Sequence, residues 1–245
     1  MAAHEASGTG RATGSDNRRV HRSTSGGSQW LAGQAVCLET RSETGREQGS
    51  MRILIACEFS GIVRDAFTRK GHTAISCDLA ASESAGLHIQ GSVEHLLNAE
   101  WDLMIAFPPC TYLSRAGAHL WSKRQLEQQR AAEFVATLWA APIPHVAIEN
   151  PIGRLNQLWR YPDQTVQPWW FGHPVTKATN LWLRGLPTLE PSNVVTPAPG
   201  RLCWTELVPG GRNQARNRSR TFKGLAEAMA DQWSNVNQEQ KEVTK

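Results

Sequence analysis

Hydrophobic and polar residues alternate along the chain in blocks that predict strands and helices in turn. Short apolar runs bounded by Gly, Pro or acidic residues predict strands, and longer runs with apolar residues three or four positions apart predict helices. From Met51 onwards, the predicted strands are Ile53–Cys57, Thr73–Asp78, His88–Gly91 (a short strand or a loop), Leu103–Phe107 and His145–Ile148. The predicted helices are Ile62–Lys70, Val93–Ala99 and Arg124–Ala140. Strands that alternate with helices predict an α/β fold with a mostly parallel sheet and helices on both faces.

The segment before this region has a different pattern. Ser, Thr and Gly make up 20 of residues 1–50, and neither the strand period nor the helix period is visible there. Such a polar segment cannot bury enough apolar surface to fold, so we expect a disordered extension, with Met51 as the natural start of the protein. A regulatory tail is the alternative interpretation of residues 1–50.

After Pro151 the alternation breaks down. Residues 156–215 are rich in Pro, Gly, Trp and Asn and contain one clear strand pattern, Asn180–Leu183, which together predict a small, irregular second lobe. The aromatic run Trp169-Trp170-Phe171 could stack on a nucleic-acid base, or it could form the core of this lobe.

The C-terminal part, residues 216–236, contains one amphipathic helix pattern over Thr221–Trp233. Its large apolar side chains, at a spacing of four, lie on one face: Leu225, Met229 and Trp233. We expect this helix to return to the core and residues 237–245 to form a disordered tail.

The composition narrows the class of protein. With 245 residues, of which 40% are hydrophobic, one domain with a sizeable core is expected. No apolar run reaches the roughly 18–20 residues of a membrane span, and we expect no secretory signal. The five cysteines are odd in number and lack C-x-x-C pairs, which argues against disulfides or a zinc site and indicates a cytoplasmic protein. A net charge of +4 permits a nucleic-acid partner without requiring one.

Chemically distinctive residues gather at the ends of the predicted strands, where parallel α/β sheets bind ligands. The loop Glu58–Gly61, read E-F-S-G, follows the first strand, and Gly61 allows the backbone to approach a ligand closely. Asp78 ends the second strand about 20 residues downstream, where an acid can accept hydrogen bonds from ribose hydroxyls. A tight turn at Gly61 and a solvated or capping role for Asp78 are the alternatives.

Cys110 follows Pro108 and Pro109 at the end of the fourth predicted strand. The two prolines cannot extend the sheet, so they place this thiol on a rigid loop where it can act as a nucleophile. The strand that precedes Glu149 should be the neighbour of this strand, because a right-handed crossover through the intervening helix joins them. Cys110 and Glu149 should therefore lie close together. A buried, inert thiol is the alternative, which we expect for the other cysteines: Cys37, Cys57, Cys77 and Cys203.

These motifs resemble those of the DNA (cytosine-5) methyltransferases, over about Met51 to Trp233. The loop F-S-G is similar to their cofactor loop, Pro108-Pro109-Cys110 to their P-P-C nucleophile loop, and Glu149-Asn150-Pro151 to their E-N-V motif. Gly91-Ser92-Val93 resembles their G-D-[IV], with Ser92 in place of the acid. The segment Arg218–Ala230 resembles a shortened form of their last motif. The pattern from Thr176 to Pro187 is similar to that of compact methyltransferase-like proteins of phages.

The resemblance implies a Rossmann-like methyltransferase fold that uses S-adenosylmethionine (SAM), with residues 51–155 as the catalytic core. Cys110 would attack carbon 6 of a flipped-out cytosine, and Glu149 would contact its N3 and exocyclic amine. The implied cofactor-binding residues are Phe59, Ser60, Gly61, Asp78, Ser92, Pro108 and Lys223. The implied substrate-binding residues are Pro109, Asn150, Lys177, Arg218 and Arg220. Carboxylated SAM, with Lys223 as the cation that receives its carboxylate, is an alternative donor that would yield carboxymethylcytosine.

The arginine-rich motif by which this family holds the cytosine is missing, and Lys177 or Arg184 could replace it. The basic stretch Arg201–Gly224 indicates contacts with DNA phosphates or, alternatively, a solvated loop. We expect a monomer that binds DNA and neither a membrane nor a metal. Two other functions stay open: a DNA-binding relative without catalysis, and a cysteine hydrolase with His119 or His145 as its base.

Overall fold

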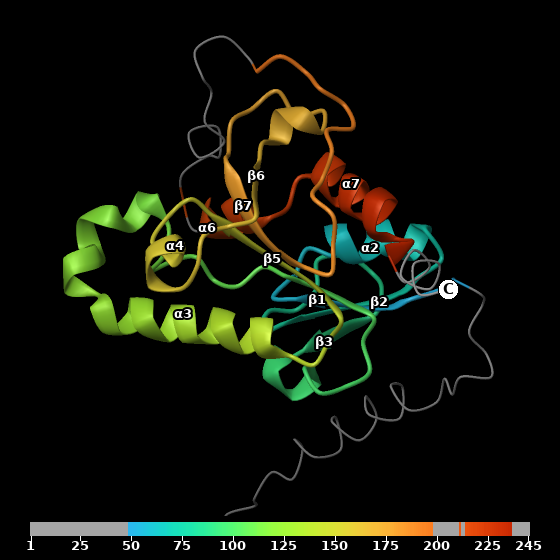
Figure 1. The fold of residues 1–245 in the computed structure, drawn as a ribbon, viewed down its shortest axis with the longest axis horizontal. Helices are drawn as coiled ribbons and strands as arrows, with labels where there is room; N and C mark the ends of the chain where they lie inside the picture. The colour runs from blue at the N-terminus through green and yellow to red at the C-terminus, as the bar shows by residue number, and fades with distance from the viewer. Residues whose placement is uncertain (1–48, 198–210, 212–213, 237–245) are drawn as a thin grey trace, which may run out of the picture. The chain divides into compact units, whose positions relative to one another are not determined.

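The computed structural model describes residues 49–197, 211 and 214–236, which form a mixed α/β fold around one sheet (Figure 1). Seven strands follow the order β3-β2-β1-β4-β5-β7-β6 across the sheet. Their bounds are Arg52–Ala56 (β1), Thr73–Asp78 (β2), His88–Gln90 (β3), Leu103–Ala106 (β4), His145–Pro151 (β5), Gln164–Val166 (β6) and Thr179–Arg184 (β7). Strands β1 to β5 pair in parallel, whereas β7 runs antiparallel to both β5 and β6.

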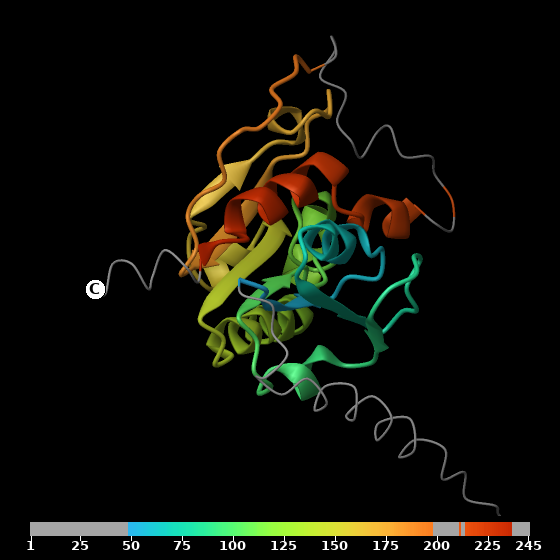
Figure 2. The ribbon, with the colours of Figure 1, turned by 90° about the vertical axis from the view of Figure 1, so that its right-hand side faces the viewer.

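The helices cover both faces of this sheet, as the sequence predicted. Figures 1 and 2 show α2 and α7 on one face and α3 on the other. The α-helices are Ile62–Arg69 (α2), Gln125–Ala140 (α3), Leu155–Leu158 (α4), Gln214–Ser219 (α6) and Lys223–Trp233 (α7). The 3-10 helices are Val93–Leu96 (η2), Arg115–Lys123 (η3) and Pro168–Trp170 (η4).

The alternating region from Met51 to Ile148 folds largely as its pattern predicts. The mostly parallel sheet is confirmed, and β4 and β5 are neighbours with Leu103 opposite His145 and Ala106 opposite Ile148. Helix α2 ends just before Gly71, whose φ of +86° favours glycine. The expected helix Val93–Ala99 is a shorter 3-10 helix that ends at Leu96.

The C-terminal helix returns to the core, as expected. Leu225, Met229 and Trp233 are all buried, and α7 packs against α2. Two exposed ion pairs, Arg69 with Glu227 and Lys70 with Asp231, join the same two helices at their outer edge.

The segment after Pro151 differs from its prediction. We expected an irregular second lobe, but β6 and β7 add two strands to the main sheet. Strand β7 is also longer than the predicted Asn180–Leu183, and its first four residues are buried. Because β7 pairs with β5 as far as Pro151, β5 continues beyond the predicted end at Ile148 and includes Glu149 and Asn150.

Several predictions concern residues outside the described part of the chain. They include the N-terminal extension up to residue 48, the tail from 237, Cys37, Cys203, and part of the basic stretch with Arg201 and Arg212. Within the described residues, no helix has both the length and the apolar character that crossing a membrane requires.

Candidate active site at the carboxyl ends of the parallel strands

The Cys110 loop and the end of β5 are joined by hydrogen bonds. The Asn150 side chain is fully buried, and its Nδ2 donates to the carbonyl oxygen of Pro108 at 3.0 Å. Further along both segments, Ser114 forms an isolated β-bridge with Gly153. The loop that follows β4 therefore lies beside the end of β5, as the sequence predicted.

Backbone hydrogen bonds stabilise the loop that carries Cys110. The Cys110 carbonyl accepts the backbone N–H groups of Leu113 and Ser114 at 3.0 and 2.9 Å, and the Leu113 carbonyl accepts that of Arg154 at 2.8 Å. The approach is so close that a Cβ atom on Gly153 would lie 1.9 Å from the Leu113 oxygen. Only glycine fits at this position without a shift of the backbone.

Glu149 influences the protonation of Cys110. Burial raises the pKa of the Cys110 thiol, the Glu149 charge raises it further, and Lys177 lowers it. Burial also raises the pKa of Glu149, against the opposing effects of Lys177 and of a hydrogen bond from Thr179. A thiol and a carboxyl group biased toward its protonated form thus lie in one partly buried site, together with a cation.

Lys177 is the cation that the structure brings to this site. Its Nζ donates to the carbonyl oxygen of Arg218 at 3.1 Å and lies 5.7 Å from the ring centroid of Phe222. The other candidate, Arg184, lies at the far end of β7 and donates to three carbonyls at the end of α3: those of Trp139, Ala141 and Ile143. Arg184 therefore stabilises a helix C-terminus and does not replace the missing arginine motif.

Glu58, at the end of β1, is a candidate functional residue that the sequence reasoning missed. Cys57, with a φ of +58°, turns the chain here, and Glu58 is only 4% exposed. Its Oε1 accepts from the Ser60 hydroxyl at 2.7 Å and from the Val63 N–H at 3.2 Å, whereas Oε2 is buried and has no hydrogen-bond partner among the described residues. Burial raises the pKa of this carboxyl group. The only sequence signal was an acid directly before F-S-G.

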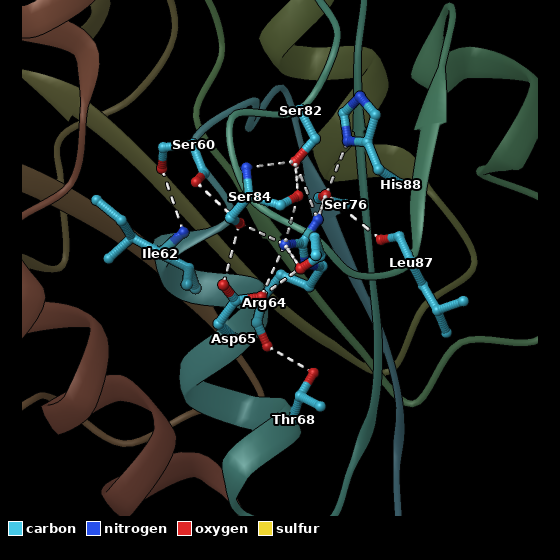
Figure 3. Close-up of polar contacts among 12 residues, drawn as sticks. Ser60, Ile62, Arg64, Asp65, Thr68, Ser76, Ser82, Ser84, Leu87 and His88 are labelled. Carbon is cyan, nitrogen blue, oxygen red and sulfur yellow. Dashed lines mark hydrogen bonds and ion pairs between the residues drawn. The ribbon is translucent and has the colours of Figure 1, made fainter.

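The loop around Gly61 is more crowded than we predicted. Its φ of +75° confirms that glycine is favoured, but a Cβ atom here would lie 2.0 Å from Ser84 Oγ and 2.5 Å from an Arg64 nitrogen. Figure 3 shows Ser84 and Arg64 gathered against this turn. The group that lies close to Gly61 is therefore Ser84, from the loop after β2, where the sequence led us to expect a ligand.

The two other predicted cofactor residues at this edge lie near each other. The Gly91 N–H, next to Ser92, donates to the Asp78 carbonyl at 2.9 Å, and the Asp78 carboxylate accepts from the Ala80 N–H at 2.8 Å. The Ser92 hydroxyl donates to the Glu94 carboxylate at 3.0 Å and caps η2. A hydroxyl in this arrangement serves the local fold, so a direct cofactor contact by Ser92 stays a prediction.

Lys223 lies on the first turn of α7, exposed, with its ammonium group 3.9 Å from Glu227 on the same helix. This contact gives no support to a role in binding a carboxylated cofactor.

Pro109 is exposed beside Cys110, whereas Pro108 is buried. The guanidinium group of Arg220, predicted to bind DNA, contacts Glu83 and Asn217.

The positions of the aromatic run and of two histidines bear on two alternatives from the sequence: base stacking and a cysteine hydrolase. Phe171 belongs to the buried core and Trp170 packs against it, which supports a core role over base stacking for these two rings. His145 is fully buried at the start of β5, at the opposite end of the strand from Glu149. His145 therefore cannot act as the base of a Cys110 hydrolase, and His119 lies exposed on η3.

The strand order defines what this edge of the sheet can bind. The chain leaves β1 toward β2 on one side, and β4 lies on the other side of β1, so the connections diverge between β1 and β4. Ligands of open α/β sheets bind in the crevice at such a point. The loops E-F-S-G and P-P-C flank it. Within the described residues, no group of three or more His, Cys, Asp or Glu side chains could hold a metal ion.

Comparisons with known proteins give no family. No family model matches the chain, and no curated protein matches it. A solved structure that matches is a co-crystal structure of WbdD with a kinase inhibitor, at 13% sequence identity and a TM-score of 0.34. The match covers 54% of this chain and 36% of that one, so the chain spans well under half of that structure's length.

Proposed function

We propose that this protein is a SAM-dependent transferase that modifies carbon 5 of cytosine in DNA. The observation that carries this proposal is the hydrogen bond from Asn150 to Pro108, because it joins the P-P-C loop to the E-N-P segment. The effect of the Glu149 charge on the pKa of the Cys110 thiol supports a site that the two residues share. Nucleophile and acid then lie at the crevice where a sheet of this topology binds its ligands.

The chemistry follows from the two protonation states. The raised pKa of Glu149 favours a protonated carboxyl group, which donates a proton to N3 of the cytosine as Cys110, after losing its own proton to solvent, attacks carbon 6. Carbon 5 would then become nucleophilic and take the activated carbon as the bond from that carbon to the sulfonium sulfur of the donor breaks. Transfer of the carbon 5 proton to water and departure of the thiolate would restore the ring, and N3 would return its proton to Glu149.

SAM would supply the activated methyl group. Glu58 fits this cofactor because a buried carboxylate oxygen without a partner can accept a hydrogen bond from the ammonium group of its methionine moiety. Phe59, Asp78 and Ser92 would line the nucleoside end, as the resemblance implies. Carboxylated SAM remains the alternative donor, but the position of Lys223 does not support it as the cation that binds the added carboxylate.

DNA would present the cytosine outside the duplex, since Cys110 cannot reach carbon 6 of a stacked base. Pro109 and Asn150 would shape the pocket for the extruded ring. Lys177 would lie near the base and compensate the charge of Glu149, whereas Arg218 would contact the DNA backbone.

The test is a covalent trap. DNA that carries 5-fluorocytosine should form a stable adduct with the protein in the presence of SAM, because fluorine on carbon 5 cannot leave as a proton does. Cys110→Ala should form none, while the control Cys77→Ala should form as much as wild type, because Cys77 is buried and its thiol pKa is about 12. An adduct in Cys110→Ala, or none in wild type, would refute the proposal.

Nucleoside mass spectrometry of the DNA product identifies the transferred group. A gain of one methyl group is expected, and a gain of a carboxymethyl group would indicate the carboxylated donor. A DNA-binding relative without catalysis would shift DNA in a binding assay and give neither adduct nor modified nucleoside.

A further inference from the structure

Glu83, Arg216 and Arg220 form a cluster that we call the Glu83 clasp. Arg216 Nε lies 2.6 Å from Glu83 Oε1, and Arg220 donates through Nε at 2.8 Å to Oε2 and through its terminal nitrogen at 2.8 Å to Oε1. These hydrogen bonds hold the pKa of Glu83 below its usual range. One carboxylate thus joins the end of α6 to the loop that follows β2.

The clasp lies directly over the proposed cofactor loop. The Glu83 N–H donates to the carbonyl oxygen of Phe59 at 2.8 Å. The Arg216 guanidinium group lies over the Phe59 ring, 4.6 Å from its centroid. Three segments that are far apart in the sequence therefore meet at the F-S-G motif: the loop after β1, the loop after β2, and α6.

The loop after β2 does not depend on the clasp for its conformation. Arg64 of α2, only 1% exposed, donates from below to Ser82 Oγ and Ser84 Oγ (Figure 3). It also donates to the Ala85 carbonyl. This buried network fixes the loop, whereas the Glu83 clasp is exposed at the surface. Loss of the clasp should accordingly free Arg216 and Arg220 and leave the loop in place, while Lys177 still holds the Arg218 carbonyl of α6 at 3.1 Å.

The clasp is suited to exchange partners with an anion. Two guanidinium groups share one carboxylate, which leaves an excess positive charge, and the side chains of Arg216 and Arg220 are 45% and 38% exposed. Exposed ion pairs are individually weak and are screened by salt. Phosphate groups bind arginine in the same bidentate manner as carboxylates do, so a DNA backbone can displace Glu83.

We propose that DNA phosphates and Glu83 compete for Arg216 and Arg220, so that DNA binding draws the Arg216 side chain of α6 away from Phe59 and accelerates cofactor exchange. The inference rests on the proposed function, because it takes the F-S-G loop as the cofactor site. DNA and cofactor then weaken each other's binding through the clasp. By thermodynamic reciprocity, each lowers the affinity for the other by the same factor.

The experiment compares Glu83→Gln with Glu133→Gln in the full chain. Both changes remove one negative charge, but Glu133 is exposed on α3 and lies outside the clasp. Glu83→Gln should bind a mixed-sequence DNA duplex about three- to five-fold more tightly and release SAM about three- to five-fold faster, as expected for the loss of two exposed ion pairs. Glu133→Gln should change both by less than about two-fold.

A second measurement follows α6 directly. In wild type, hydrogen exchange of the backbone amides of residues 214–220 should accelerate when the duplex is added, and it should already be fast in Glu83→Gln. If wild type binds SAM and DNA but the two variants have equal duplex affinities and equal SAM release rates, the competition at the clasp is refuted and the proposed function stays intact. If wild type does not bind SAM, the proposed function and the cofactor half of the inference both fail. In that case the duplex affinities and the hydrogen-exchange rates still test whether DNA and Glu83 compete for Arg216 and Arg220.

Discussion

At the scale of single residues, the site combines groups whose charges oppose one another. Glu149 raises the pKa of the Cys110 thiol, and Lys177 lowers it. A thiolate next to an ionised carboxylate is unfavourable, whereas a thiolate next to a protonated carboxyl group is not. The pair is therefore suited to a reaction in which the carboxyl group is protonated when the sulfur attacks.

Glu149→Gln should make Cys110 easier to ionise and should slow the proposed reaction. Without the carboxylate charge, the thiol pKa falls, so alkylation of Cys110 by iodoacetamide should reach half its maximal rate at a lower pH than in wild type. The rate of cytosine modification should fall by about 10²- to 10⁴-fold, because glutamine cannot protonate N3.

Lys177→Gln is the opposing variant. Removal of this cation raises the thiol pKa, so the alkylation profile should move to higher pH. If both variants move the profile in the same direction, or if neither moves it, the electrostatic assignment of the site is wrong.

Single residues also show what the sequence could reveal about the site. The placement of Cys110 and Glu149 at the ends of two neighbouring strands was predictable, because each follows a recognisable apolar strand and belongs to a three-residue motif. Their catalytic roles stay predictions. Glu58 was not, since its significance lies in one carboxylate oxygen that burial leaves without a partner. Arg184 was misread because its carbonyl partners at the end of α3 lie more than 40 residues away in the sequence.

At the scale of elements, the close approach of two loops determines where Cys110 lies. Gly153→Ala should disturb it, because the new methyl group would overlap the Leu113 carbonyl, a backbone atom that cannot rotate away. We expect a loss of about 1–3 kcal/mol in the free energy of unfolding, as for other overpacked sites. Urea denaturation monitored by tryptophan fluorescence measures this loss.

The matched control is Gly117→Ala on η3, where a Cβ atom would lie 3.4 Å from the nearest atom, the Thr111 carbonyl oxygen. It should change stability by less than about 1 kcal/mol. In Gly153→Ala the yield of the 5-fluorocytosine adduct should also fall at temperatures where the protein stays folded. An unchanged adduct yield would mean that the Ser114–Gly153 bridge does not position Cys110.

The elements themselves were predictable only where local pattern and tertiary pairing agree. The five parallel strands and α2, α3 and α7 follow their hydrophobic periods. Strand β6 has only three residues, too few for a period, and β7 was shortened because Thr179 and Arg184 at its ends are polar. Both strands owe their conformation to pairing with β5, which no local pattern contains.

At the scale of the whole molecule, the strand order brings together residues that lie far apart in the sequence. Glu58 follows β1, Cys110 follows β4, and Glu149 ends β5, so all three reach the same edge of the sheet. Arg216, far along the chain, joins them through Glu83. A ligand that binds at this edge therefore contacts the core of the fold and should stabilise the whole domain.

SAM should stabilise the full chain in a way that depends on pH through Glu58. Burial raises the pKa of Glu58 above its ordinary value of 4.5, so the folded protein holds this proton over a range in which the unfolded chain has lost it. Without ligand, the contribution of Glu58 to stability therefore decreases as pH rises through that range. An ammonium group beside Oε2 favours the ionised form, so the stabilisation by SAM should grow over the same range.

Differential scanning calorimetry can measure both effects. At about 100 times its Kd, SAM contributes about 2.7 kcal/mol, which corresponds to a rise in Tm of roughly 5–10 °C for a domain of this size. Glu58→Gln should reduce the affinity about ten-fold or more, through loss of a charge-assisted hydrogen bond, and should make the rise in Tm independent of pH below about pH 7. Glu133→Gln should behave as wild type. A Tm rise in wild type that is constant from pH 4.5 to 7 would show that Glu58 does not bind the cofactor, because a carboxylate that gains an ammonium partner must release its proton more readily.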